Sequence, residues 1–356
     1  MLDLTESNPT RCAFRYLKPE ILKALTHPKN LIYEPDPRGL FEAREAICQY
    51  YAGHGVKVTP GQIFLTASTS EAYNFVFRLM TDPGDQVLIP RPSYPLFEYL
   101  LSLNDLKRNH YSLIYAERWA IDIASLQAAA SSQTRGIVLV NPNNPTGNFV
   151  GEAEKEEINS FCTAKGLFII SDEVFFDFAF VPKKESSFAG NDKVLSFTLS
   201  GISKILGLPQ MKLSWIVVSG PPDLRQRAIE RLEIIADTFL SVNTPSQRAL
   251  PAWLRGQKTI RKEVLGRLLS NKKYLEEKFQ KNEKVRVLKA EGGWYAVLQI
   301  HSDLSDEELA LRLLKNQGVF VHPGYFFDFE EGNFLVLSLL PPPEIFRKGV
   351  EGISIF

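Results

Sequence analysis

The sequence predicts an α/β fold in which a large domain with a mostly parallel central sheet is accompanied by a smaller α+β domain. At 356 residues, the chain is too long for one small hydrophobic core. From about residue 40, helical segments alternate with short strand-like segments, which is the pattern of an α/β domain with right-handed crossovers. The segments at 137–140, 167–170 and 194–198 are almost entirely apolar, as is typical of parallel strands buried on both faces.

The remaining elements follow in chain order and divide the chain into two parts. Helices are expected at 40–51, 70–80, 223–239 and 259–282, and further strands at 62–66 and 86–89. Beyond them the pattern becomes mixed, with strands at 285–288 and 294–300, a helix at 306–315, and strands near Val319 and Phe334. We therefore expect a large domain over residues 34–270 and a small domain formed by residues 1–33 and 271–356.

The composition is that of an ordinary globular protein without a dominant charge. Lys plus Arg and Asp plus Glu both number 41, so no basic field would attract nucleic acid or an anionic membrane. No apolar stretch reaches the roughly 18 residues of a membrane span, and the first residues lack the features of a signal peptide. The three cysteines are scattered, and the five histidines show no metal-binding spacing. We therefore expect a cytoplasmic protein without a structural disulfide or a metal site.

Lys204 is the most informative single residue. It follows the apolar segment 194–199 and lies among small residues. A half-buried lysine is costly to keep charged, so its pKa should fall and its amine should become nucleophilic. Such an amine is suited to forming a Schiff base with an aldehyde. Taken alone, a solvated surface lysine would be the simpler interpretation.

Hydroxyl groups and an aromatic side chain follow two other expected strands. Ser68, Thr69 and Ser70 open a helix, where hydroxyls, backbone N–H groups and the helix dipole can hold a phosphate. The alternative is a plain helix cap. Tyr94 lies between two prolines that fix its loop, so its ring can stack on a flat heteroaromatic ring. The alternative for Tyr94 is ordinary packing.

An amide and an acid follow two more strands. Asn144 lies in the sequence NPNNPTG at 141–147 and can donate to a ring phenolate, unless the segment only forms Asx turns. Asp172 follows the strand at 167–170, where an acid is costly unless it is paired. A protonated pyridine nitrogen would be such a partner. The alternative for Asp172 is a cap or a surface acid.

Together these residues predict a site for pyridoxal 5′-phosphate (PLP). Lys204 would form the Schiff base, Asp172 would hold the ring nitrogen, and both would be catalytic. Asn144 would bind the phenolate oxygen, and Tyr94 would cover a face of the ring. The phosphate would be held by four side chains, those of Ser68, Thr69, Ser70 and Lys212.

The motifs around these residues resemble the class I/II aminotransferase family of fold-type I PLP enzymes. The resemblance runs from about Tyr33 to Lys212 and continues more loosely to the end of the chain. It rests on PGD at 83–85, PSYP at 92–95, NPNNPTG at 141–147, SDEV at 171–174, and Ser203-Lys204 with GLP at 207–209. The sequence NTPSQ at 243–247 also matches a family loop near the substrate entrance.

The resemblance implies a fold-type I PLP-dependent transferase, with Ser203 added to the cofactor-binding residues. It also implies a homodimer with shared active sites, in which Tyr33 reaches the phosphate bound by the neighbouring subunit. Two cofactor positions depart from the family. Phe175 replaces the usual tyrosine and cannot donate to the phenolate oxygen, which leaves Asn144 to make that interaction alone. Lys212 replaces the usual arginine and keeps the charge without the bidentate fork.

A third departure concerns the substrate. The family places a carboxylate-binding arginine where this chain has Val336. Either the substrate lacks an α-carboxylate, or another cation such as Arg11 or Arg15 replaces the arginine. The apolar segment 321–327 is expected to pack in the core, with an aromatic-rich pocket as the alternative.

The resemblance implies an aminotransferase that acts by ping-pong chemistry on a small-molecule amino donor and acceptor. Lys204 would be the base that moves a proton between the substrate carbon and the cofactor. Residues 238–241 offer no arginine, which makes dicarboxylates poor candidates for the substrate. A PLP-dependent lyase or decarboxylase, or a non-catalytic protein of the same fold, is the alternative.

Overall fold

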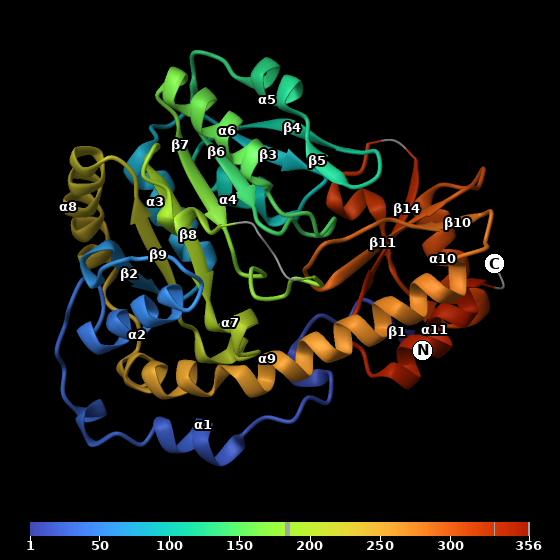
Figure 1. Cartoon of the computed structure of the whole chain (residues 1–356), viewed down its shortest axis with the longest axis horizontal. Helices are drawn as coiled ribbons and strands as arrows, with labels where there is room; N and C mark the ends of the chain where they lie inside the picture. The colour runs from blue at the N-terminus through green and yellow to red at the C-terminus, as the bar shows by residue number, and fades with distance from the viewer. Residues whose placement is uncertain (182–185, 331, 355–356) are drawn as a thin grey trace.

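The computed structural model describes residues 1–181, 186–330 and 332–354. Its largest feature is an eight-stranded sheet with the order β2-β9-β8-β7-β6-β3-β4-β5 (Figure 1). The strands are β2 (Ile63–Thr66), β3 (Gln86–Arg91), β4 (Lys107–Tyr115), β5 (Trp119–Ile121), β6 (Thr134–Val140), β7 (Phe168–Asp172), β8 (Ser196–Gly201) and β9 (Ser214–Ser219). The central strands from β4 to β8 pair in parallel, and β2, β9 and β5 add antiparallel edges. The predicted mostly parallel sheet is therefore confirmed.

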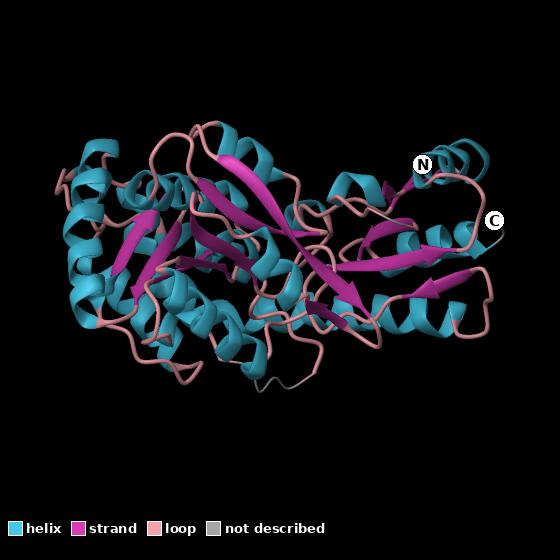
Figure 2. Ribbon diagram, turned by 90° about the horizontal axis from the view of Figure 1, so that it is seen from above, coloured by secondary structure: helices cyan, strands magenta, loops and turns pink. Residues whose placement is uncertain are grey.

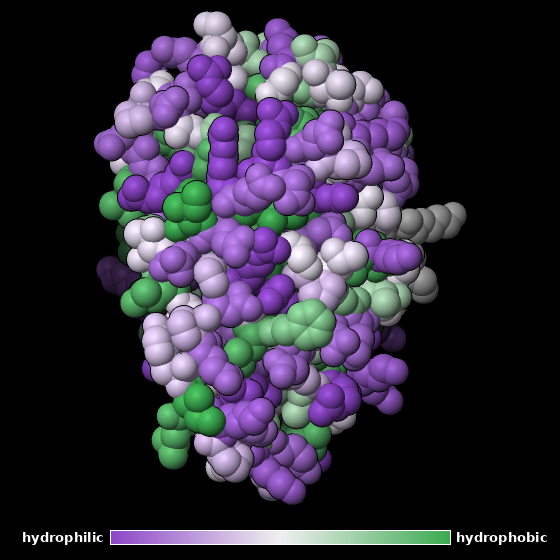
Figure 3. Space-filling view, turned by 90° about the vertical axis from the view of Figure 1, so that its left-hand side faces the viewer, coloured by the Kyte–Doolittle hydropathy of each residue, from purple (hydrophilic) through white to green (hydrophobic). Residues whose placement is uncertain are grey.

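Helices cover both faces of this sheet because successive strand residues point to opposite sides. Val138 and Val140 pack with α3 and α8, whereas Ile137 and Leu139 belong to the core on the other face. The helices up to α8 are α1 (Lys18–Ala24), α2 (Phe41–Ala52), α3 (Thr69–Met80), α4 (Leu96–Ser102), α5 (Ile123–Ala129), α6 (Glu152–Lys165), α7 (Ile202–Ile205) and α8 (Pro222–Phe239). Viewed from the end that carries α8, the surface is polar and interrupted by separate apolar groups (Figure 3).

A second, four-stranded antiparallel sheet with the order β10-β11-β14-β13 lies beside the first (Figure 2). Its strands and the elements around it are β10 (Val285–Val287), β11 (Tyr295–Ile300), α10 (Asp306–Gln317), β12 (Val319–Phe320), β13 (His322–Pro323), β14 (Asn333–Ser338) and α11 (Pro343–Ser354). β1 (Leu2–Asp3) pairs in parallel with β12, so the first residues of the N-terminal segment lie beside this part of the chain.

Helix α9 (Thr244–Phe279) runs past both sheets in Figure 1. The prediction of a helix at 259–282 was wrong about its beginning. Asn243 caps the helix by accepting a hydrogen bond from the Ser246 N–H at 3.0 Å, and a proline follows in the first turn. The segment expected to form a loop at 243–247 is therefore the start of α9. The division into two domains at residue 270 stays a prediction, and that position lies inside this continuous helix.

Candidate functional site

A cavity of about 420 Å³ lies at the carboxyl ends of β6, β7 and β8. Ligands of open α/β sheets bind at this end of the strands. The predicted site residues that line the cavity are Thr69, Ser70, Tyr94, Asn144, Asp172, Phe175, Ser203, Lys204 and Lys212. Ser68 and Tyr33, also predicted, do not line it.

Lys204 projects into this cavity from α7, directly after β8. The chain enters α7 through Gly201, where a Cβ atom would lie 2.3 Å from the Ser214 hydroxyl oxygen, so a glycine is needed for this close approach. The Lys204 Nζ lies 4.9 Å from the centre of the Trp294 ring and 5.4 Å from that of Phe175. Burial lowers the pKa of Lys204 to about 8, although the nearby Asp172 opposes the shift. A substantial fraction of this amine is therefore neutral near pH 8.

Asp172 ends β7 and also lines the cavity. Its carboxylate accepts hydrogen bonds from the Val174 N–H and from the Tyr73 hydroxyl, each at 3.1 Å. Burial raises the pKa of Asp172 to about 6, while these two hydrogen bonds and Lys204 act in the opposite direction. Tyr73 was missed because, in the sequence, it is an ordinary apolar-face residue of α3.

The amino-terminal end of α3 contributes hydroxyl groups to the cavity. Thr69 and Ser70 line it from the first helical turn, where the N–H groups have no intrahelical partner. Ser68 instead caps the helix, and its Oγ accepts a hydrogen bond from the Glu71 N–H at 3.1 Å. Of the two interpretations of Ser68, the helix cap is thus the one seen. Lys212 lines the same cavity from a left-handed backbone conformation with φ of 48°.

Asn144 provides a test of whether these residues fit PLP. Its side-chain Oδ1 is buried, and no hydrogen bond among the described residues engages it. An unsatisfied buried acceptor is costly, so a ligand group that donates a hydrogen bond would relieve Oδ1, whereas a phenolate oxygen would accept from the Nδ2 of the same amide. The set of lysine, acid, amide and hydroxyl side chains matches the aldehyde, ring nitrogen, phenolate and phosphate of PLP. The residues therefore fit the cofactor.

The cavity is closed by residues from the second sheet and the N-terminal segment. These residues are Ser7, Tyr295, His322, Phe326 and Phe327. The segment 321–327 forms both core and pocket, since Val321 is fully buried whereas Phe326 is 44% exposed and lines the cavity. Ser7 was missed as a site residue, because nothing in its local sequence signals this position, and His322 was considered only as part of the segment 321–327, for which core packing was expected.

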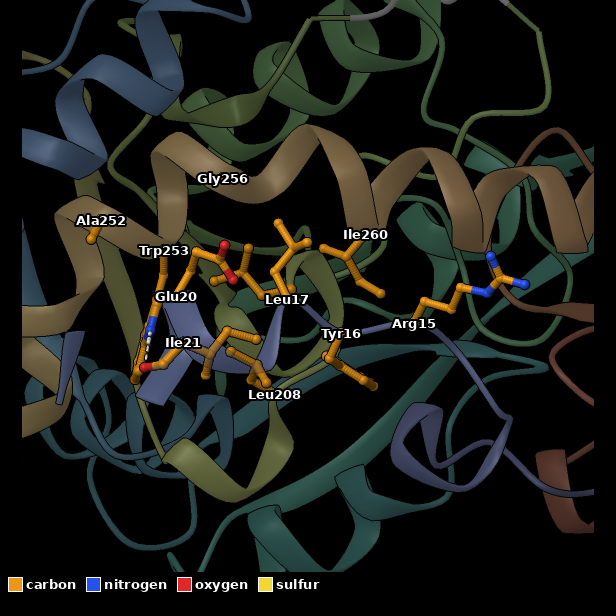
Figure 4. Close-up of a pocket in the computed structure, with 11 residues that line it drawn as sticks. Arg15, Tyr16, Leu17, Glu20, Ile21, Leu208, Ala252, Trp253, Gly256 and Ile260 are labelled. Carbon is orange, nitrogen blue, oxygen red and sulfur yellow. Dashed lines mark hydrogen bonds between the residues drawn. The ribbon is translucent and has the colours of Figure 1, made fainter. Parts of the chain in front are cut away.

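Val336 is fully buried in β14 and is not among the residues that line the cavity. Arg11 and Arg15 are exposed, and neither lines it. Arg15 instead borders a smaller cavity of about 90 Å³ between α1 and α9, in which the Trp253 indole N–H donates to the Ile21 carbonyl (Figure 4). In that view the Arg15 guanidinium extends away from the other lining residues. The replacement of the family arginine by Arg11 or Arg15 thus finds no support.

Within the described ranges, no cluster of His, Cys, Asp and Glu side chains has the arrangement of a metal site. In the same part of the chain, no helix has the length and apolar character needed to span a membrane.

The fold and the half-buried lysine in its cavity define a PLP-dependent transferase of fold type I. The "Aminotransferase class I and II" family matches residues 1–344. The chain therefore belongs to that family, and it is a PLP-dependent aminotransferase. The relatives it resembles include "Glutamate-pyruvate aminotransferase AlaA" of Haemophilus influenzae, which is 27% identical over 90% of this chain and 81% of the relative. "Alanine aminotransferase" of Mycobacterium bovis is 27% identical over 100% of this chain and 85% of the relative.

Among solved structures, the alanine aminotransferase from Pyrococcus furiosus superposes with a TM-score of 0.91 at 27% identity. The match covers 100% of this chain and 91% of that structure. Fold, family and cofactor thus agree with the expectations from the sequence.

Proposed function

We propose that this aminotransferase uses Lys204 as its catalytic base and transfers the amino group of a small amino acid or amine to a keto acid or aldehyde by ping-pong chemistry. The observation that carries the proposal is the half-buried Lys204, whose amine has its pKa lowered to about 8 in the cavity that also contains Asp172. A base with a pKa near the working pH can both accept and return a proton efficiently.

Each side chain of the cavity has a role toward bound PLP in this proposal. Asp172 holds the ring nitrogen and Tyr94 covers a ring face, while Asn144 alone donates to the phenolate oxygen because Phe175 has no hydroxyl group. The phosphate is held by Thr69, Ser70, Ser203 and Lys212. When bound, the cofactor supplies an electron sink for the bond broken at the substrate carbon. Lys204 Nζ would accept the proton that leaves the substrate carbon and would later return it.

The relatives' names suggest the first substrates to test. They are called alanine and glutamate-pyruvate aminotransferases. Because no arginine lines the cavity among the described residues, we propose small uncharged or apolar amino donors rather than dicarboxylates. Glutamate serves as the contrasting donor.

We further propose a homodimer with shared active sites. Tyr33 is 75% exposed and lies outside the cavity of its own chain, as a residue that serves a second subunit would. Leu31 and Phe41, also exposed, are apolar surface that a partner would cover. A cytoplasmic location remains a prediction from the sequence.

The test is the absorbance spectrum of the PLP-loaded protein during titration with L-alanine, L-glutamate and simple amines. A productive donor should convert the bound cofactor to its amine form, and pyruvate should reverse the change. The Lys204→Ala variant should fold and hold PLP but give no turnover, and substantial activity would refute the role of Lys204. Product release without conversion of the cofactor would instead identify a lyase or decarboxylase.

A further inference from the structure

His322 begins β13 and lines the same cavity as Lys204. Its Cα partner across the sheet is Val336 in β14, and side chains of directly opposite residues point to the same face. The imidazole therefore stands beside Val336. The rings of Phe326 and Phe327 each lie with their centres 5.8 Å from the imidazole and restrict its orientation.

The hydrogen bonds of the imidazole are incomplete. Its Nδ1 is buried and has no hydrogen-bond partner within the described part of the chain. A second N–H at Nδ1 would thus have no acceptor, and burial lowers the pKa of His322 although Asp3 acts in the opposite direction. We assign the single proton of the neutral ring to Nε2, because an N–H at the buried Nδ1 would have no acceptor within the described part of the chain.

The charges in the cavity are unevenly distributed. The lysines that line it, Lys204 and Lys212, come from the segments that follow β8. The second sheet and the N-terminal segment contribute only neutral polar groups to the described lining, namely the hydroxyls of Ser7 and Tyr295 and the imidazole of His322. A substrate oxygen on this side would meet neutral donors.

We propose that His322 determines substrate specificity by donating a hydrogen bond from Nε2 to an oxygen on the carbon next to the amine-bearing carbon of the substrate. The inference rests on the proposed aminotransferase function and names its substrate class, amino compounds with an oxygen acceptor at that position. A neutral donor discriminates weakly between a carboxylate and an uncharged amide, unlike a fixed guanidinium, which favours a carboxylate through two charge-assisted bonds.

The experiment compares L-alanine with L-alaninamide as donors for wild-type protein and for two variants. His322→Phe keeps a flat ring but removes the donor, and it should raise KM for both compounds about tenfold with little change in kcat. His322→Gln places an amide N–H near the position of Nε2 and should restore KM to within about threefold of wild type. Tyr325→Phe, an exposed neighbour outside the cavity, is the matched control and should change nothing.

Several results would overturn the inference. An unchanged KM in His322→Phe, or a failure of folded His322→Gln to restore it, would remove His322 from substrate binding. A wild-type preference for L-alanine over L-alaninamide of more than about a hundredfold would show that a fixed charge reads the carboxylate. The PLP spectrum of each variant should equal that of wild type. If wild-type protein converts neither compound, the inference fails, and the titration with L-glutamate and simple amines shows separately whether the proposed function fails too.

Discussion

At the scale of single residues, the cavity holds an amine and an acid whose pKa values are shifted toward each other. Burial lowers the pKa of Lys204 to about 8 and raises that of Asp172 to about 6. Both shifts come from removing charge from water, so each group is less stable in its ionised form than it would be in the unfolded chain. The shifted pKa values of Lys204 and Asp172 favour proton transfer near neutral pH but reduce the stability of the folded protein.

Replacing Lys204 by methionine should therefore stabilise the cofactor-free protein. A fall of the lysine pKa from 10.5 to about 8 corresponds to about 3 kcal/mol at pH 7, where both states are protonated. Between pH 8 and 10.5 the unfolded chain binds more protons, so wild-type stability rises with pH and the advantage of the variant shrinks. Denaturant unfolding at pH 7 and pH 10 measures both effects, and equal stabilities at pH 7 would contradict the prediction.

Removing the Tyr73 hydroxyl should slow catalysis through Asp172. The hydroxyl donates to the carboxylate at 3.1 Å, and a hydrogen bond to a charged group is worth about 1.5 kcal/mol, or about tenfold in rate. Tyr73→Phe should lower kcat about tenfold and move the acidic limb of its pH profile upward, because the pKa of Asp172 rises further. Tyr111→Phe is the control, since its hydroxyl donates to the Val138 carbonyl instead. An unmoved acidic limb in Tyr73→Phe would refute the coupling.

At the scale of elements, α2 and α9 are joined through the segment after β7 by the carboxylate of Asp177. This side chain is 1% exposed and accepts from His54 Nε2 at 3.0 Å, the Tyr50 hydroxyl at 2.7 Å and Arg261 at 2.5 Å. Burial alone would raise the pKa of Asp177, but the hydrogen bonds and positive charge around it hold that pKa below the ordinary value of an aspartate. The acid thus fastens three segments that are distant in the sequence.

The Asp177→Asn variant should lose about 3 kcal/mol of unfolding free energy, because it leaves buried donors and Arg261 without their charge partner. The folded-state pKa is depressed, so the contribution of Asp177 is fully present above the ordinary aspartate pKa and is lost as the pH falls through the folded value. Glu277→Gln, in an exposed pair with Lys273 at 3.7 Å, should change stability by less than about 0.5 kcal/mol. Similar losses in both variants would contradict this account.

The elements differ in how well their sequences predicted them. The strands around 137–140 and 167–170 were recognised because both faces are buried, which gives continuous apolar runs. β4 was missed because its first residues are exposed and charged, as befits a strand near the edge of the sheet. Lys204, Asp172 and Asn144 lie at or just after the ends of their strands and line one cavity, as expected. Ser7 was not found, and His322 was included only in a segment expected to pack in the core, since the positions of both depend on long-range packing of the second sheet.

At the scale of the whole molecule, the proposed dimer makes a prediction about mixtures. Lys204→Ala should inactivate the site that contains Lys204, whereas Tyr33→Ala should weaken PLP binding in the neighbouring subunit's site. A mixed dimer of the two variants contains one site with both native residues. Unfolding and refolding the variants together should therefore restore up to about a quarter of wild-type activity.

The controls are the separately refolded variants, which should stay near their own low activities. The molecular mass of each refolded variant, measured by analytical ultracentrifugation, should be that of a dimer. A mixture no more active than the sum of its parts, or a monomer at micromolar concentration, would show that the sites are not shared.

The arrangement of the cavity has a consequence for how the protein is made. The residues proposed to hold PLP within one chain lie between Thr69 and Lys212, whereas the opposite wall needs Tyr295 to Phe327 and the early Ser7. On the ribosome, the cofactor half of the site is thus synthesised well before the half that faces the substrate. Ser7 precedes both groups in the chain, and its segment must wait for β12 before it can dock. The nascent chain can therefore bind PLP before the residues that select the substrate are in place.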